Sequence, residues 1–151
     1  MQRFWSGTVD SVYHKFVLWV SDEALSVLRI DSTIFIDATF RVTPAPFAQC
    51  LIVMNHDPTT NIFVPCAWAL MTGKNETLYC EVLHALLVLL KYRWEPKVAV
   101  ADFEQALLNS VKYQFPRSKI VGCFFHFQQA VFRKMKRWQS QTAKRRSPAV
   151  C

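Results

Sequence analysis

Hydrophobic positions in the first half of the chain fall into short, strand-like runs. Residues 16–20 form one such run, and Ser21-Asp22-Glu23 after it has the cap residue and first-turn acids of a helix start. Three further runs, residues 33–40, 47–54 and 62–70, are rich in β-branched and aromatic residues and are separated by turn-forming residues. These patterns predict a strand, a short helix and then a three-stranded antiparallel meander.

The second half alternates helical and strand-like patterns. Apolar residues recur at helical spacing over residues 76–93, which predicts a long helix with one strongly apolar side, and Pro96 ends it. Four elements follow, a buried strand, a helix, a strand and a closing helix, over residues 97–101, 103–115, 120–123 and 124–138.

The order of three strands, helix, strand, helix, strand and helix predicts an α/β fold of the ribonuclease H-like class. Its five-stranded mixed sheet has three antiparallel strands and then two parallel strands, and helices flank it. Residues 1–31 are interpreted as an N-terminal strand and helix leading into the core, residues 32–138 as the core, and residues 139–151 as a basic disordered tail.

Composition supports one globular domain. The chain has 151 residues, of which 52% are hydrophobic, and this is enough for one core. The longest apolar stretches, such as residues 85–90, are far shorter than the roughly 18 residues that span a bilayer, so membrane insertion is not expected. Because no signal-like segment follows Met1, the five irregularly spaced cysteines are interpreted as reduced, mostly structural thiols.

Charge is strongly segregated along the sequence. Eight Lys/Arg and all eleven Asp/Glu lie at or before Glu104, whereas ten Lys/Arg and no acid follow it. A cationic C-terminal third suits a polyanion, because each neutralised phosphate releases condensed counterions. The same pattern fits a solvated helix with a basic tail, so charge alone leaves DNA binding open.

Two aspartates stand at positions where an acid needs an explanation. Asp37 lies inside the first strand of the meander, where an unpaired carboxylate is costly, and Asp102 lies where the buried fourth strand meets the next helix. Each has a structural alternative, because Asp37 could face solvent and Asp102 could be a helix N-cap. In the predicted topology the two strands are parallel neighbours, so the carboxylates should converge. Such carboxylates repel unless a hard divalent cation such as Mg2+ lies between them.

Three motifs, in this order, resemble the catalytic domain of Mutator-like (MULE) DNA transposases. Ile36-Asp37-Ala38-Thr39-Phe40 is similar to the family's aspartate-glycine-threonine-phenylalanine strand, with Ala38 in place of the usual glycine. Ala101-Asp102-Phe103-Glu104-Gln105-Ala106 resembles its second aspartate motif. Phe115-Pro116 and then Gly122-Cys123-Phe124-Phe125-His126-Phe127 resemble its phenylalanine-proline and cysteine-x-x-histidine signature. The resemblance covers about residues 16–136.

The resemblance implies cleavage and transfer of DNA strands, with Asp37 and Asp102 as the first two members of an acid triad that binds Mg2+ or Mn2+. In the family the third member is a glutamate well downstream of the cysteine-x-x-histidine motif. No acid follows Glu104 here, and Glu104 itself is expected to favour a helix N-terminus. The chain is therefore interpreted as a C-terminally truncated transposase core that is inactive alone. The alternatives are a domesticated DNA-binding module and a structural protein whose acids only cap and solvate.

Cys123 and His126 could supply two zinc ligands, and Cys80 and His84 on the long helix could supply two more. The amphipathic helix would bury Cys80 in any case, so structural roles are favoured over zinc. Cys123 then ends a strand and His126 lies on the closing helix. Their presence in the family motif indicates a role near the active site or DNA that spacing alone does not define.

The candidate DNA contacts are basic residues of the closing helix and tail, interleaved with an aromatic side chain as phosphate contact and base stacking require. They are Arg133, Lys134, Lys136, Arg137, Lys144, Arg145 and Arg146. Basic clusters of this kind are also typical of nuclear import signals. With the family resemblance they predict a nuclear protein that binds DNA and no membrane. The sequence leaves a homo-oligomer open.

Overall fold

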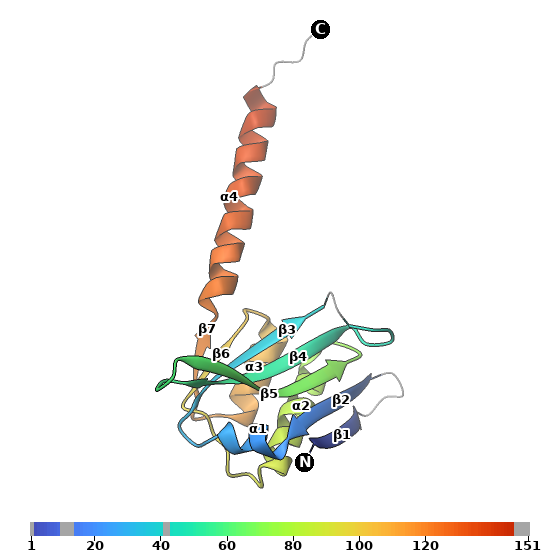
Figure 1. Cartoon of the computed structure of the whole chain (residues 1–151). Helices are drawn as coiled ribbons and strands as arrows, with labels where there is room; N and C mark the ends of the chain where they lie inside the picture. The colour runs from blue at the N-terminus through green and yellow to red at the C-terminus, as the bar shows by residue number, and fades with distance from the viewer. Residues whose placement is uncertain (1, 10–13, 41–42, 147–151) are drawn as a thin grey trace.

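A mixed sheet forms the centre of the computed structural model (Figure 1). The structure describes the backbone of residues 2–9, 14–40 and 43–146, and side chains within residues 15–40 and 43–141. Seven strands lie in the order β1-β2-β5-β4-β3-β6-β7. They are β1 (Gln2–Val9), β2 (His14–Ser21), β3 (Thr33–Thr39), β4 (Gln49–Asp57), β5 (Ile62–Met71), β6 (Val98–Ala101) and β7 (Lys119–Gly122).

Five of these strands have the predicted arrangement. Strands β5, β4 and β3 form an antiparallel meander, and β6 and β7 are added in parallel to the edge of β3. The predicted count of five is wrong, because the described part of the chain adds β1 and β2. Strand β2 pairs antiparallel with β5, with Phe16 opposite Met71, and β1 pairs with β2. This pairing joins residues far apart in sequence, so local pattern does not show it, and it covers the free edge of β5.

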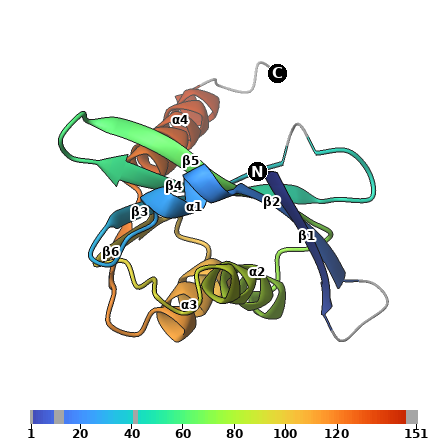
Figure 2. The same cartoon turned by 60° about the horizontal axis from the view of Figure 1, so that its bottom comes forward.

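Two helices cover one face of the sheet, and Figure 2 shows α2 and α3 side by side there. The helices are α1 (Asp22–Val27), α2 (Glu76–Leu89), α3 (Gln105–Gln114) and α4 (Phe124–Arg146). Leu78 and Leu86 of α2 are fully buried with Ile34, Ile36 and Leu51 of the sheet. Burying each such side chain stabilises the fold by about 2 kcal/mol. In the described part of the chain, no helix has both the length and the apolar character to cross a membrane.

Side chains cap the first two helices. Ser21 Oγ accepts a hydrogen bond from Ala24 N at 3.0 Å, so α1 begins where the sequence predicts. Asn75 Oδ1 accepts from Leu78 N at 2.8 Å and starts α2. Helix α2 ends before the predicted residue 93, because the chain turns at Lys91 and Tyr92, whose φ angles are 53° and 56°.

Helix α4 leaves the sheet after β7 and extends away from it (Figure 1). Among its described side chains only His126 and Gln129 are partly covered. The helix continues to Arg146, whereas the sequence was interpreted as a disordered tail from residue 139. No helix-breaking residue occurs before Pro148, and the intervening residues are mostly good helix formers. The rest of the predicted tail, residues 147–151, lies outside the described residues.

Candidate functional site

Asp37, in the C-terminal half of β3, and Asp102, directly after β6, lie side by side on neighbouring parallel strands. These strands are parallel and Ile36 pairs with Ala101, so the next residue on each is one of the aspartates. Ile36 and Ala101 are buried, whereas the side chains of Asp37 and Asp102 are 49% and 43% exposed. Because side chains alternate along a strand, the two carboxylates lie on the sheet face opposite α2 and α3.

Both carboxylates are held by the backbone in the same way. Asp37 Oδ1 accepts a hydrogen bond from Ala38 N at 2.8 Å, and Asp102 Oδ1 accepts one from Phe103 N at 2.6 Å. Within the described residues no hydrogen bond to either Oδ2 atom occurs. One oxygen of each aspartate is thus fixed, and the other is available to a cation, water or substrate.

His126, in the first turn of α4, lies between the two aspartates. Its Nε2 is 3.6 Å from Asp37 Oδ1, and its Nδ1 is 3.8 Å from Asp102 Oδ1. These separations are too long for direct hydrogen bonds. His126 Nδ1 is nevertheless buried and has no hydrogen-bond partner among the described residues. The imidazole therefore stands against both carboxylates with one ring nitrogen unsatisfied.

Cys123 contributes to this arrangement through its backbone. Its N–H donates to Ala101 O at 2.8 Å, which extends the pairing of β6 with β7, and its carbonyl accepts from Phe127 N at 3.0 Å in the first turn of α4. Cys123 thus has the structural place that its spacing favoured, and it directs α4 so that His126 reaches the acids. His84, the other histidine considered as a zinc ligand, contacts Tyr92 instead, with its Nε2 3.5 Å from Tyr92 Oη.

Glu104 is directed toward a buried tyrosine. Its Oε2 accepts a hydrogen bond from Tyr79 Oη at 3.0 Å, and Gln49 Nε2 donates to the same hydroxyl at 2.9 Å. Burial raises the pKa of the Tyr79 phenol well above its usual range, so the hydroxyl stays a donor. Glu104 is also the N-cap residue of α3 but makes no side-chain capping bond. The alternative in which Asp102 caps this helix is therefore wrong, whereas Glu104 does lie at the helix N-terminus, where its charge was expected to be favourable.

A cavity of about 570 Å3 opens beside Asp102 and His126. Its other walls include Phe40, Phe103 and Arg133, which come from the end of β3, the loop after β6 and α4. The cavity therefore combines one carboxylate, an imidazole, aromatic rings and a guanidinium group. A polyanion with flat rings would suit the guanidinium group and the aromatic rings, whereas the Asp102 carboxylate needs a cation or a hydrogen-bond donor.

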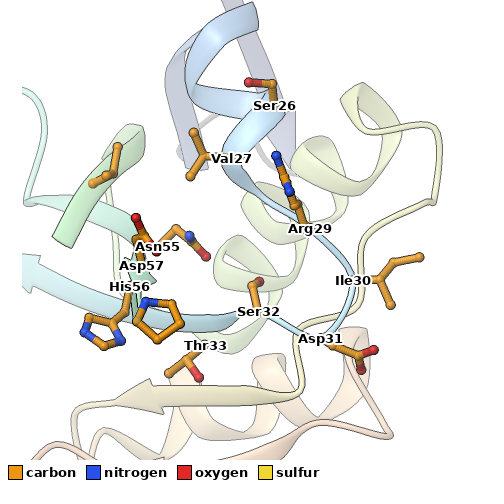
Figure 3. A pocket seen from close by; sticks show the side chains of 12 residues that line it. Ser26, Val27, Arg29, Ile30, Asp31, Ser32, Thr33, Asn55, His56 and Asp57 are labelled. Carbon is orange, nitrogen blue, oxygen red and sulfur yellow. The ribbon is translucent and has the colours of Figure 1, made fainter. Parts of the chain in front are cut away.

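A second cavity, of about 590 Å3, lies at the opposite end of β3. Figure 3 shows the side chains of Ser32 and Asn55 facing its interior. Ser32 Oγ and Asn55 Oδ1 are buried and lack a hydrogen-bond partner in the described part of the chain. Thr33 at its rim precedes Asp37 by four residues, roughly 13 Å along a strand. This cavity is therefore separate from Asp37 and Asp102.

Of the predicted DNA contacts, Arg133 lies closest to the acids. It lines the cavity beside Asp102, and its Nη2 donates to Gln129 Oε1 at 2.6 Å. Farther along α4 lie the exposed Lys134, Lys136 and Arg137, and then Lys144, Arg145 and Arg146, whose side chains are outside the described part. The predicted contacts therefore follow one helix that begins at the acid pair.

The two aspartates fit a hard divalent cation only in part. Mg2+ is commonly held by one or two carboxylates, several waters and substrate oxygens, and two half-exposed carboxylates side by side meet that requirement. Within the described residues, however, no group of three or more His, Cys, Asp or Glu side chains is placed to hold a metal ion. Two carboxylates alone would leave most of the coordination of one cation to water and substrate.

The sequence places His126 on the closing helix and, through the family motif, near the active site or DNA, but it did not predict that the imidazole lies between the two aspartates. The available signal was the parallel pairing of β6 with β7, in which Ala101 stands opposite Gly122. A helix that starts directly after Gly122 begins next to the residue after Ala101, which is Asp102. The angle at which this helix leaves the sheet depends on three-dimensional packing and is not encoded in a local pattern.

Comparison with known families assigns the chain to one of them. A search of curated proteins finds no match to the chain. The family model of the MULE transposase domain matches residues 33–130, from the first residue of β3 into α4, and so includes both aspartates and His126. Since this match covers well over half of the sequence, the chain belongs to the MULE transposase domain family.

Proposed function

We propose that this chain is the part of a MULE transposase that binds DNA at a divalent cation held by Asp37 and Asp102. The family implies DNA as the partner and cleavage and transfer of DNA strands as the reaction. The observation that carries the proposal is the position of the two carboxylates side by side on adjacent parallel strands. The meander with two parallel strands added beside β3 supports a ribonuclease H-like fold.

In this proposal each residue at the site has a distinct task. Asp37 and Asp102 each present one free carboxylate oxygen to the same space, and His126 contacts a substrate oxygen that enters between them. A bound Mg2+ or Mn2+ would supply Lewis-acid activation of water or a hydroxyl and would neutralise charge at the phosphate. Arg133 at the neighbouring cavity binds a flanking phosphate and orients the strand.

The number of acids limits what the chain does alone. Two-metal phosphoryl transfer needs enough carboxylates to hold both cations, and here the third nearby acid, Glu104, is bound to Tyr79. We therefore propose that the 151-residue chain is a partial transposase core that binds the cation and DNA without cleaving it. Nuclear localisation belongs to the same proposal, since DNA is the partner and α4 is basic.

The main alternative is a domesticated DNA-binding module that has lost the chemistry. The observation in its favour is the exposed helix α4, which carries seven Lys/Arg and no acid. In that case DNA binding would be independent of the aspartates. The two functions therefore differ in whether Asp37 and Asp102 matter for cation binding.

Titration calorimetry with Mn2+ tests the proposal. Wild-type protein should bind Mn2+ weakly, and Asp37→Asn or Asp102→Asn should each abolish the heat of binding, because each removes one of two charged ligands. Glu81→Gln is the matched control, since Glu81 is an exposed acid on α2 and should leave binding unchanged. Unchanged binding in either aspartate variant would remove that residue from the site.

A further inference from the structure

Three exposed phenylalanine side chains gather at the cavity beside Asp102. Phe40, Phe103 and Phe127 are 51%, 54% and 52% exposed, and all three line the cavity of about 570 Å3 that His126 also borders. They come from the end of β3, the loop after β6 and helix α4. Exposed aromatic rings that converge beside polar groups are typical of binding surfaces rather than of a core.

The ring of Phe103 is seated on Gly122. Ala101 of β6 pairs with Gly122 of β7, and a Cβ at Gly122 would come within 2.5 Å of Phe103 Cε1 and Cζ. The ring therefore lies directly against the backbone of β7. A ring that is held in place before a ligand arrives loses little conformational entropy on binding.

Two cationic side chains adjoin these rings, together with the single carboxylate of Asp102. Arg133 lines the cavity and is oriented by its hydrogen bond to Gln129, and Lys74 Nζ lies 5.5 Å from the centre of the Phe40 ring. Positive charge around aromatic rings matches a ligand in which an anion is joined to a flat ring, as in a nucleotide. A second copy of α4 fits poorly, because this helix carries seven Lys/Arg and no acid and two copies would repel.

We propose that this cavity binds an unpaired nucleobase of the DNA, next to the phosphate that would bind the cation held by Asp37 and Asp102. The inference rests on the proposed function and adds a base contact to it. Phe103 stacks on the base, and Arg133 contacts a flanking phosphate. A base inside a duplex has both faces covered, so it must leave the stack first, which costs least where it is already unpaired. Because every base has a π face, the contact tolerates any sequence.

Fluorescence anisotropy of the full chain with three labelled DNAs tests this proposal. The DNAs are a paired duplex, the same duplex with a short single-stranded flap, and that flap with abasic residues. Wild-type protein should bind the intact flap roughly tenfold more tightly than either other DNA. Phe103→Ala should remove this preference and leave binding of the paired duplex unchanged. Gly122→Ala, which displaces the ring without deleting it, should have the same effect.

Tyr113→Ala is the matched control, because Tyr113 is an aromatic side chain on α3 that is 76% exposed. This variant should bind all three DNAs as wild type does. Melting followed by circular dichroism checks the fold, and Phe127→Ala replaces Phe103→Ala if that variant is unfolded. If loss of the ring weakens the abasic and intact flaps equally, the base contact is wrong.

Two further outcomes separate this inference from the function on which it rests. Equal wild-type affinity for all three DNAs overturns the base contact alone, whereas no binding of any DNA at low salt overturns the proposed function as well. Light scattering on the same samples completes the test. A dimer that Phe103→Ala dissociates would mean that a second copy fills the cavity, and it would also overturn the proposal.

Discussion

Asp37 owes its position to the two-residue repeat of β3. Ile34 and Ile36 face α2 and α3 and are buried, so Asp37 faces the other side of the sheet. A shift of register by one residue would bury this carboxylate and expose the isoleucines. Asp102 follows the buried Ala101 by the same alternation. The acid pair therefore depends on its apolar neighbours as much as on the carboxylates.

Tyr79→Phe should destabilise the fold by about 1–2 kcal/mol, because it removes the donor to Glu104 and the acceptor of Gln49 at a buried position. Since folding raises the pKa of Tyr79, the wild-type contribution is complete below about pH 10 and is lost as the pH rises above that value. Urea denaturation at pH 8 and above pH 10 measures the free energy of unfolding of both proteins. The difference between wild type and Tyr79→Phe should be smaller at the higher pH.

The exposed Tyr113 on α3 provides the control for this series. Tyr113→Phe should leave the free energy of unfolding unchanged at both pH values. If Tyr79→Phe were as stable as wild type at pH 8, the hydrogen bonds of Tyr79 would contribute nothing to stability.

At the scale of elements, the parallel strands β3, β6 and β7 bring the site together. The C-terminal half of β3 and the residue directly after β6 present the aspartates, and the helix that follows β7 brings His126 over them. Loops at the opposite ends hold these strands, where Arg117 donates to the Glu95 carboxylate and Ser118 to Pro96 O. The site thus depends on contacts at both ends of the parallel strands.

The sequence predicts those elements whose causes are local. Runs of β-branched residues, helical spacing and breakers such as Pro96 were sufficient to predict β3 to β7 and the helices, and parallel pairing then put Asp37 near Asp102. The pairing of β2 with β5 was not predictable, because it joins distant residues through backbone groups that any sequence offers. The contacts of His126 with the two aspartates and of Glu104 with Tyr79 were not predicted for a related reason, since these neighbours are fixed by tertiary packing.

Glu95→Gln should lower the thermal midpoint at pH 7, because hydrogen bonds from Arg117 hold the pKa of the Glu95 carboxyl below its usual range. A lowered pKa means that the stabilisation is present above about pH 4.5 and is lost as the pH falls through the folded value. The difference in thermal midpoint between Glu95→Gln and wild type should therefore vanish at acidic pH and become smaller at high salt. Glu81→Gln, an exposed acid on α2, should show neither effect.

At the scale of the molecule, the basic side chains extend along α4 in one direction from the acid pair. The acid pair lies at the base of α4, and the exposed basic side chains follow the helix away from it. Arg137 is eleven residues beyond His126, which is roughly 16 Å along a helix axis. A DNA strand whose phosphate lies at the acids could therefore reach the basic residues with its neighbouring phosphates.

Replacing Lys134, Lys136 and Arg137 by glutamine should weaken binding to unrelated duplexes equally. Each lost phosphate contact should flatten the slope of log K against log salt by about 0.9, because fewer counterions are released. Lys112→Gln is the control, since Lys112 lies on α3 away from α4 and should leave the slope unchanged. An unaltered slope in the triple variant would exclude α4 as the DNA contact surface.

The chain alone should neither cleave nor join DNA with Mg2+ or Mn2+. Two carboxylates can share one cation with water and substrate, but they cannot hold the two cations that flank a phosphate during transfer, and no acid follows Glu104. An end-cleavage and strand-transfer assay on the parent element's terminal repeats, with Asp37→Asn as the blank, measures this. Activity above the blank would mean that Glu104 leaves Tyr79, or that a second chain lends an acid, and the interpretation as a partial core would then have to be abandoned.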